Sequence, residues 1–161
     1  AGGPGKGMYS RLYTRVLNRY SWAQNCTAFH SIFNDTGIVG ISAMANAAHT
    51  GDMVKVMASE LQAVAASGAV TPQELERAKN ATVSSVLMSL ESKAVVAEDI
   101  GRQILTYGYR KSAADFIAEV RAVTAEDVSK AAADLLVSAP TVAMSGELHA
   151  APRYEEIKGM F

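Results

Sequence analysis

The sequence predicts an α+β fold, with an antiparallel-rich sheet and a block of helices packed on one face of it. Two neighbouring segments, residues 26–33 and 38–44, are rich in apolar and β-branched side chains, as strands are. Repeated helix-start and helix-stop signals follow from Asp52 to Leu136. A short apolar segment, residues 141–145, is predicted to be a closing strand. Strands that mostly precede a run of helices are typical of α+β domains.

Length and composition are those of one globular domain. The chain has 161 residues, of which 49% are hydrophobic and 19% charged, and its net charge is −1. A chain of this length can bury a core, so we expect residues 1–161 to form a single domain. Nucleic acid is not an expected partner, because domains that bind it are strongly basic.

The first seven residues, Ala-Gly-Gly-Pro-Gly-Lys-Gly, contain four glycines and one proline. Glycine widens the conformational freedom of the backbone and proline removes a donor, so residues 1–7 are predicted to be a loop. Gly5-Lys6 resembles the end of a phosphate-binding loop, but Gly7 stands where that motif has Ser or Thr. From the residues alone, a flexible linker remains the alternative.

A helical segment is predicted after this loop. One apolar stripe and one basic stripe each recur every four residues, which indicates an amphipathic helix with a cationic edge. The apolar stripe consists of Met8, Leu12, Val16 and Tyr20, and the basic stripe of Arg11, Arg15 and Arg19. The basic stripe could face phosphate or an acidic protein surface, or it could be a solvated helix face.

Turn and cap residues divide the rest of the chain. Residues 34–37, Asn-Asp-Thr-Gly, favour a hairpin between the two strands. Asp52 is predicted to cap a helix with an apolar side. That side comprises Met53, Met57, Leu61 and Val64. Residues 71–74, Thr-Pro-Gln-Glu, form a capping box with proline in the first turn.

The later helices are predicted from similar signals. Residues 89–93 interrupt the helix that begins after Thr71, and Gly108 ends the following one. Ser112 and Thr124 each open a further helix. The last of these helices is expected to bury Val128, Ala131, Leu135 and Leu136. Residues 150–161 are expected to be an irregular tail.

The residues offer no catalytic or metal site of their own. His30, His49 and His149 are far apart in the sequence, and neither a His-x-x-Glu-His motif nor its inverse is present. Cys26 and His30 would be about 13 Å apart along a strand, too far for a nucleophile–base hydrogen bond. The sequence therefore predicts a chain without catalytic residues or bound metal.

Three segments resemble the insulinase/pitrilysin family of zinc peptidases. Residues 2–13, Gly-Gly-Pro-Gly-Lys-Gly-Met-Tyr-Ser-Arg-Leu-Tyr, resemble the glycine-rich loop and following helix of its non-catalytic mitochondrial subunits. Residues 71–79 resemble a capped helix in the second half of the family's subunits, and residues 98–103 with 123–128 continue that likeness in family order.

The resemblance implies a role in recognition. It implies the second-half domain of a non-catalytic subunit, plant-like in character, of the heterodimeric peptidase that removes presequences from imported mitochondrial proteins. The expected substrate-binding residues are Gly2, Gly3, Gly5, Lys6 and Gly7. Zinc is expected in the partner catalytic β subunit. The expected location is the mitochondrial matrix or the matrix face of the inner membrane.

The resemblance also suggests a gap and an alternative. Domains of this family begin with a strand and a helix before the loop, so we expect an exposed sheet edge here. An N-terminal segment of the same protein, another polypeptide, or self-association of this chain that pairs its edges would cover it. The alternative function is that of a structural core protein of the ubiquinol–cytochrome c oxidoreductase, with respiratory subunits as partners. In plants the resemblance implies both roles in one protein. An unrelated α+β binding module is a third hypothesis.

Overall fold

The computed structural model describes residues 8–33 and 35–161. In these ranges the chain is a mixture of one antiparallel hairpin and several helices, so the predicted α+β class is confirmed. The chain divides into two compact units. The first comprises the described part of Ala1–Ala66 together with Lys130–Phe161, and the second comprises Ser67–Ser129.

The first unit is built on the hairpin. Strand β1 (Ala23–Ile32) pairs with β2 (Gly37–Ala45), and Cys26 lies opposite Ala43. The register of the pair shifts between Ala23 and Asn25, near the start of β1. Among the described residues the sheet has these two strands only. The antiparallel pairing was predicted correctly, but the sheet is smaller than expected.

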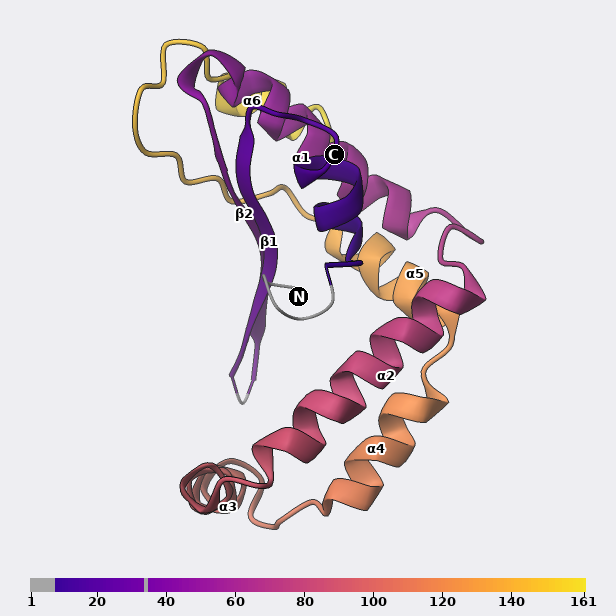
Figure 1. Ribbon diagram of the computed structural model, residues 1–161. Helices are drawn as coiled ribbons and strands as arrows, with labels where there is room; N and C mark the ends of the chain where they lie inside the picture. Colours follow the sequence, from indigo (N-terminus) through magenta and orange to yellow (C-terminus); the bar gives the residue numbers. More distant parts are fainter. Residues whose placement is uncertain (1–7, 34) are drawn as a thin grey trace. The chain divides into compact units, whose positions relative to one another are not determined.

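One face of the hairpin carries the core of the first unit. A short helix, η1 (Leu12–Leu17), and the longer α1 (Thr50–Ala65) meet the hairpin there. Val16, Cys26 and Met53 form the buried centre of this contact. Figure 1 shows both helices beside the hairpin. The 3₁₀ turn η2 (Ala47–His49) links β2 to α1.

Two predictions for the start of the first unit need correction. Met8 lies outside η1 and is exposed, so the helix is shorter than the predicted stripe. Asp52 does not cap α1, because the N-cap position is His49 and Asp52 lies in the first turn. Its carboxylate instead contacts the His49 ring, with 3.0 Å between Nδ1 and Oδ2.

The C-terminal segment also differs from the prediction. Residues 141–145 form no strand in the described structure, because a strand needs a hydrogen-bonded neighbour and only β1 and β2 pair there. The segment after Ala150, expected to be irregular, contains helix α6 (Tyr154–Lys158). Ile157 of α6 is almost fully buried, and Gln62 of α1 donates a hydrogen bond to the carbonyl of Met160 at 2.6 Å.

The second unit consists of helices whose boundaries agree with the sequence signals. They are α2 (Pro72–Ser89), α3 (Lys93–Tyr107), α4 (Ala113–Ala122) and the first part of α5 (Ala125–Leu135). The capping box at Thr71 and Glu74 is present, and Gly108 ends α3 in the left-handed conformation. These predictions are confirmed.

Helices α2 and α4 lie side by side within the second unit (Figure 1). Lys79 of α2 donates a hydrogen bond to the Arg121 carbonyl of α4 at 2.9 Å. The predicted buried face of α5 is only partly correct. Ser129 and Ala132 are buried and Val128 and Leu136 are half-buried, whereas Ala131 and Leu135 are exposed.

Candidate functional site

The residues expected to bind substrate, Gly2, Gly3, Gly5, Lys6 and Gly7, lie outside the described residues. The structure does describe the chain that follows them directly, from Met8 onward. The candidate site therefore comprises η1, which follows the glycine-rich segment in the chain, and the part of α1 that contacts it.

Local hydrogen bonds start η1. The Ser10 carbonyl accepts from the Thr14 amide at 2.9 Å and from the Thr14 hydroxyl at 3.1 Å. The Ser10 hydroxyl also accepts from the Tyr13 amide at 3.4 Å. Just before this start, Met8 has a φ of 41°, which is uncommon for a residue with a side chain. The chain thus turns sharply before it enters the helix.

Helix η1 is a π-helix, which is wider than an α-helix. The Asn18 amide donates to the Tyr13 carbonyl five residues earlier, at 2.9 Å. Such turns are rare and are often found at functional sites. On its inner side Val16 is fully buried against Cys26 and Met53, so the helix is seated on the core of its unit.

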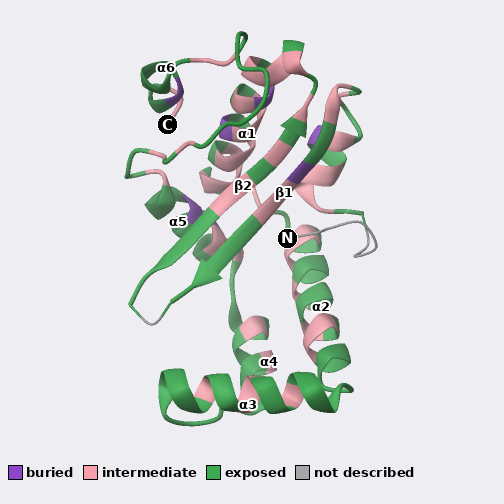
Figure 2. Cartoon of the chain, turned by 90° about the vertical axis from the view of Figure 1, so that its left-hand side faces the viewer, coloured by how far each residue is buried: buried purple, intermediate pink, exposed green. Residues whose placement is uncertain are grey.

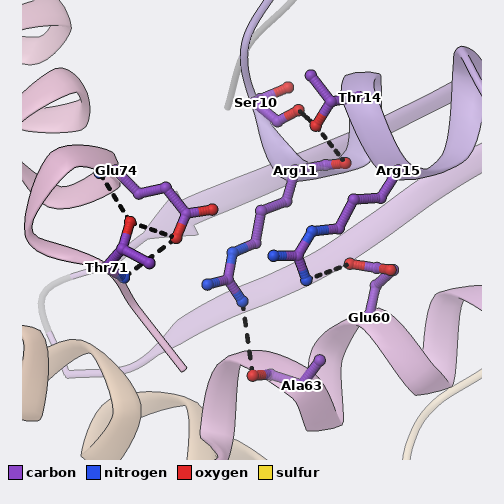
Figure 3. A network of polar contacts seen from close by, with 8 residues as sticks. All are labelled: Ser10, Arg11, Thr14, Arg15, Glu60, Ala63, Thr71 and Glu74. Atoms are coloured by element: carbon purple, nitrogen blue, oxygen red, sulfur yellow. Dashed lines mark hydrogen bonds and ion pairs between the residues drawn. The ribbon is translucent and has the colours of Figure 1, made fainter. Parts of the chain in front are cut away.

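The arginine stripe contacts other residues of the first unit. Arg11 donates from Nη1 to the Ala63 carbonyl of α1 at 3.5 Å, and the Arg15 guanidinium lies 3.8 Å from the Glu60 carboxylate (Figure 3). The Arg19 guanidinium carbon lies 5.5 Å from the centre of the Tyr20 ring, a cation–π contact. Two of the three arginines thus contact α1. The sequence suggested a surface for phosphate or an acidic protein, or a solvated helix face, and did not include this contact within the chain.

Glu60 brings a carboxylate close to the core. Its Oε2 atom is buried and, within the described residues, accepts no hydrogen bond, so the Arg15 charge is its counterpart there. Burial, and secondly the charge of Glu60, raises the pKa of Cys26 to about 11. The thiol therefore stays protonated near neutral pH, which makes it a poor nucleophile.

The histidines lie apart and have different surroundings. His30 is exposed on β1 although Cys26 on the same strand is buried. The His49 ring stacks on Trp22, with centroids 5.1 Å apart, and His149 lies 3.3 Å from the Glu147 carboxylate. In residues 8–33 and 35–161, no three His, Cys, Asp or Glu side chains are grouped as metal ligands.

A shallow hollow lies between the start of α1 and the C-terminal segment, and Lys55, His149 and Glu156 contribute to its lining. Over the described residues, no helix has both the length and the apolar character that a membrane crossing requires.

Part of the chain matches the sequence model of a peptidase family. Residues 5–82 match the model of the Peptidase M16 inactive domain. An inactive-domain match fits a non-catalytic subunit.

The curated relatives are more specific. The whole chain is 47% identical to the probable mitochondrial-processing peptidase subunit alpha-1 of Arabidopsis thaliana and 45% identical to the subunit alpha of Solanum tuberosum. It is 42% identical, over 98% of its length, to the subunit alpha of Homo sapiens. The chain spans about a third of each relative, 32%, 32% and 30% respectively. The resemblance predicted from the sequence is therefore confirmed: this chain is similar, over all or nearly all of its length, to these mitochondrial α subunits.

Comparison with solved structures supports the fold. A chain in the structure of complex III2 from Candida albicans, bound to Inz-5, aligns with a TM-score of 0.82. The alignment covers 93% of this chain and 36% of the other, at 20% identity. At that identity the likeness concerns the fold alone.

Proposed function

We propose that this chain is part of the non-catalytic, substrate-recognition subunit of a heterodimeric zinc metallopeptidase that removes presequences from imported mitochondrial proteins. The observation that carries the proposal is the similarity of the whole chain to mitochondrial-processing peptidase α subunits of plants and of human. The match to an inactive-domain model supports the non-catalytic role. Zinc would be held by the partner catalytic β subunit, and the assembly would work in the matrix or on the matrix face of the inner membrane.

In this proposal, Gly2, Gly3, Gly5, Lys6 and Gly7 contact the presequence peptide. Mitochondrial presequences share an amphipathic, arginine-rich and acid-poor character rather than one sequence. A segment rich in glycine offers backbone donors and acceptors without side chains that would favour one sequence. Backbone contacts suit such a variable group of substrates.

The described structure supports this role through its electrostatics. A cationic peptide would be repelled by free arginines beside its binding segment. The guanidinium groups of Arg11 and Arg15 instead contact an acceptor and a carboxylate on α1, and that of Arg19 lies over Tyr20. Of these contacts the Arg15–Glu60 ion pair offsets a positive charge, so it reduces the repulsion that a cationic presequence would meet beside η1.

The test is deletion of residues 2–7 from the α subunit in the assembled heterodimer. The probe is a synthetic presequence peptide that is arginine-rich and has no acidic residue. We expect its KM to rise by about tenfold or more, which corresponds to about 1.4 kcal/mol of lost binding. Zinc content should not change. Leu105→Ala, at an exposed position of α3, is the control. A KM equal to that of the undeleted enzyme would contradict the recognition role.

A second candidate function is that of a structural subunit in the respiratory ubiquinol–cytochrome c oxidoreductase. It is favoured by the fold likeness to a chain of complex III2, with a TM-score of 0.82. Respiratory subunits would then be partners, and the two functions are compatible in one protein. Co-purification of the α subunit with cytochrome subunits, measured by haem absorbance, would support this function, and their complete absence would exclude it.

A further inference from the structure

We propose that the outer edge of strand β2 is a self-association surface, which pairs in antiparallel fashion with the same edge of a second copy of this chain. The pairing joins two hairpins into one four-stranded sheet, with Val39 of one copy opposite Val39 of the other. This inference rests on the hairpin alone and does not depend on the proposed function.

The register of the hairpin shows which backbone groups of β2 face outward. The Phe33 amide donates to the Thr36 carbonyl at 2.9 Å, so these two residues form a hydrogen-bonded pair. Along an antiparallel ladder such pairs alternate with pairs whose amides and carbonyls point away from the neighbouring strand. Near the turn, the outward-facing residues of β2 are therefore Gly37, Val39 and Ile41. Among the described residues, their backbone groups bond to no other segment.

The hairpin lacks the features that protect a sheet edge from pairing. Natural edges are protected by charged side chains, prolines, bulges or covering segments. Strands β1 and β2 contain no Lys, Arg, Asp, Glu or Pro, and the one shift in their register is at the end far from the turn. Figure 1 shows the turn end of the hairpin extending beyond η1 and α1. A second copy therefore meets no like charge at this edge.

The side chains favour β2 over β1 and determine the register. A two-fold axis through an outward-facing residue places that residue opposite itself in the second copy. On β1 the residue at the same level is His30, so two imidazoles would meet. On β2 it is Val39, which is 55% exposed. A β-branched apolar residue is a favourable cross-strand neighbour.

The opposite face of the sheet gains an apolar contact in the same register. One position to either side of Val39, Ile38 of one copy lies opposite Gly40 of the other. The Phe29 ring covers Gly40, since a Cβ built on Gly40 would lie 2.7 Å from Phe29 Cζ. Ile38 and Phe29 are 55% and 45% exposed. The pairing removes both side chains from water, because Ile38 then packs beside the Phe29 ring of the second copy.

The expected dimer is weak. Pairing of about five residues on each strand buries less than the roughly 1,200 Å² of a stable interface. Antiparallel pairing places the helix-covered ends of the two hairpins at opposite ends of the new sheet, so η1 and α1 do not obstruct it. We therefore expect association at micromolar concentrations of the chain.

Sedimentation equilibrium of the 161-residue chain tests the proposal. The mean mass should rise from the monomer value of 17.0 kDa towards that of a dimer as the concentration is raised. Val39→Lys places two cations opposite each other and should raise the dissociation constant by about tenfold or more. His30→Lys adds the same charge at the paired position of β1 and is the matched control, which should leave the dissociation constant unchanged.

A mixture of two variants tests the two-fold register. Val39→Lys and Val39→Asp should each be monomeric alone, and their mixture should dimerise because the lysine then meets the aspartate. Should these variants fail to fold, amide hydrogen exchange of the unaltered chain decides. At high concentration the Val39 amide should exchange more slowly, whereas the His30 amide should exchange at its former rate.

Several results would overturn the inference. One is a monomeric mass at every concentration, and another is a Val39→Lys chain that associates as well as the unaltered chain. Equal weakening by His30→Lys would indicate pairing through β1 or a general effect of charge. Equal exchange of the Val39 amide at low and high concentration would exclude the pairing without any variant. A sedimenting complex that contains a different polypeptide would show that a second copy is not the occupant of this edge.

Discussion

The two units of the chain differ in the contacts that stabilise each of them internally. In the first unit, Val16, Cys26, Met53 and Ile157 are buried although they are far apart in the sequence. In the second unit, α2, α3 and α4 are described throughout and none of their residues is buried. Figure 2 shows this contrast in its colours. Long-range apolar contacts define the first unit.

Local hydrogen bonds define much of the second unit. The Thr71 hydroxyl accepts from the Glu74 amide at 3.2 Å, and the Ser112 hydroxyl accepts from the Asp115 amide at 3.1 Å. The Thr124 hydroxyl accepts from the Asp127 amide at 3.1 Å. Large apolar side chains such as Leu105 remain exposed. The difference teaches that one unit depends on distant residues and the other mainly on neighbours in sequence.

The largest expected effect is in the core of the first unit. Ile157→Ala should lower the free energy of unfolding by about 2–4 kcal/mol, because it removes a buried side chain and leaves a cavity. Leu105→Ala, 87% exposed in the second unit, should change it by less than about 0.5 kcal/mol. Urea unfolding followed by fluorescence of the single tryptophan, Trp22, measures the first unit, since Trp22 packs against its core. Equal effects at the two positions would remove the contrast between the units.

A smaller effect concerns pH and Cys26. Burial raises the pKa of its thiol in the folded chain from 9.0 to about 11. The folded chain therefore holds the proton where the unfolded chain releases it, so this contribution to stability is complete below pH 9 and is lost as the pH rises towards 11. We expect a loss of about 2 kcal/mol over this range.

The Cys26→Ala chain provides the reference for this measurement, because other groups also titrate at high pH. Urea unfolding of both chains at several values between pH 8 and 11 isolates the thiol. Parallel curves for the two chains would show that the thiol is not buried in solution.

The smallest expected effects on stability are those of replacing two glycines of the second unit, and they have opposite signs. Gly108 has a φ of 76°, which disfavours residues with side chains, so Gly108→Ala should destabilise the chain by about 1 kcal/mol. Gly101 lies inside α3, and no described atom is within 4 Å of a Cβ built there. Gly101→Ala should therefore stabilise the helix by about 0.5–1 kcal/mol. Thermal unfolding followed by circular dichroism checks the opposite signs. Changes of the same sign would mean that α3 does not depend on local conformation alone.

The sequence by itself determined the features whose causes are local. The hairpin, the capping box at Thr71, the caps at Ser112 and Thr124, and the stop at Gly108 were predicted because each depends on residues within a few positions. The family resemblance also came from contiguous motifs. The expected binding residues at positions 2–7 came from that resemblance and remain a prediction.

Only the tertiary structure decided the features that depend on distant partners. Residues 141–145 have the composition of a strand, but a strand forms only beside another backbone. Ile157 is buried although its neighbours in the sequence are charged. Glu60 faces Arg15, which is forty-five positions earlier in the chain. Such contacts depend on which segments pack together in three dimensions. The spacing of residues along one segment does not predict that packing.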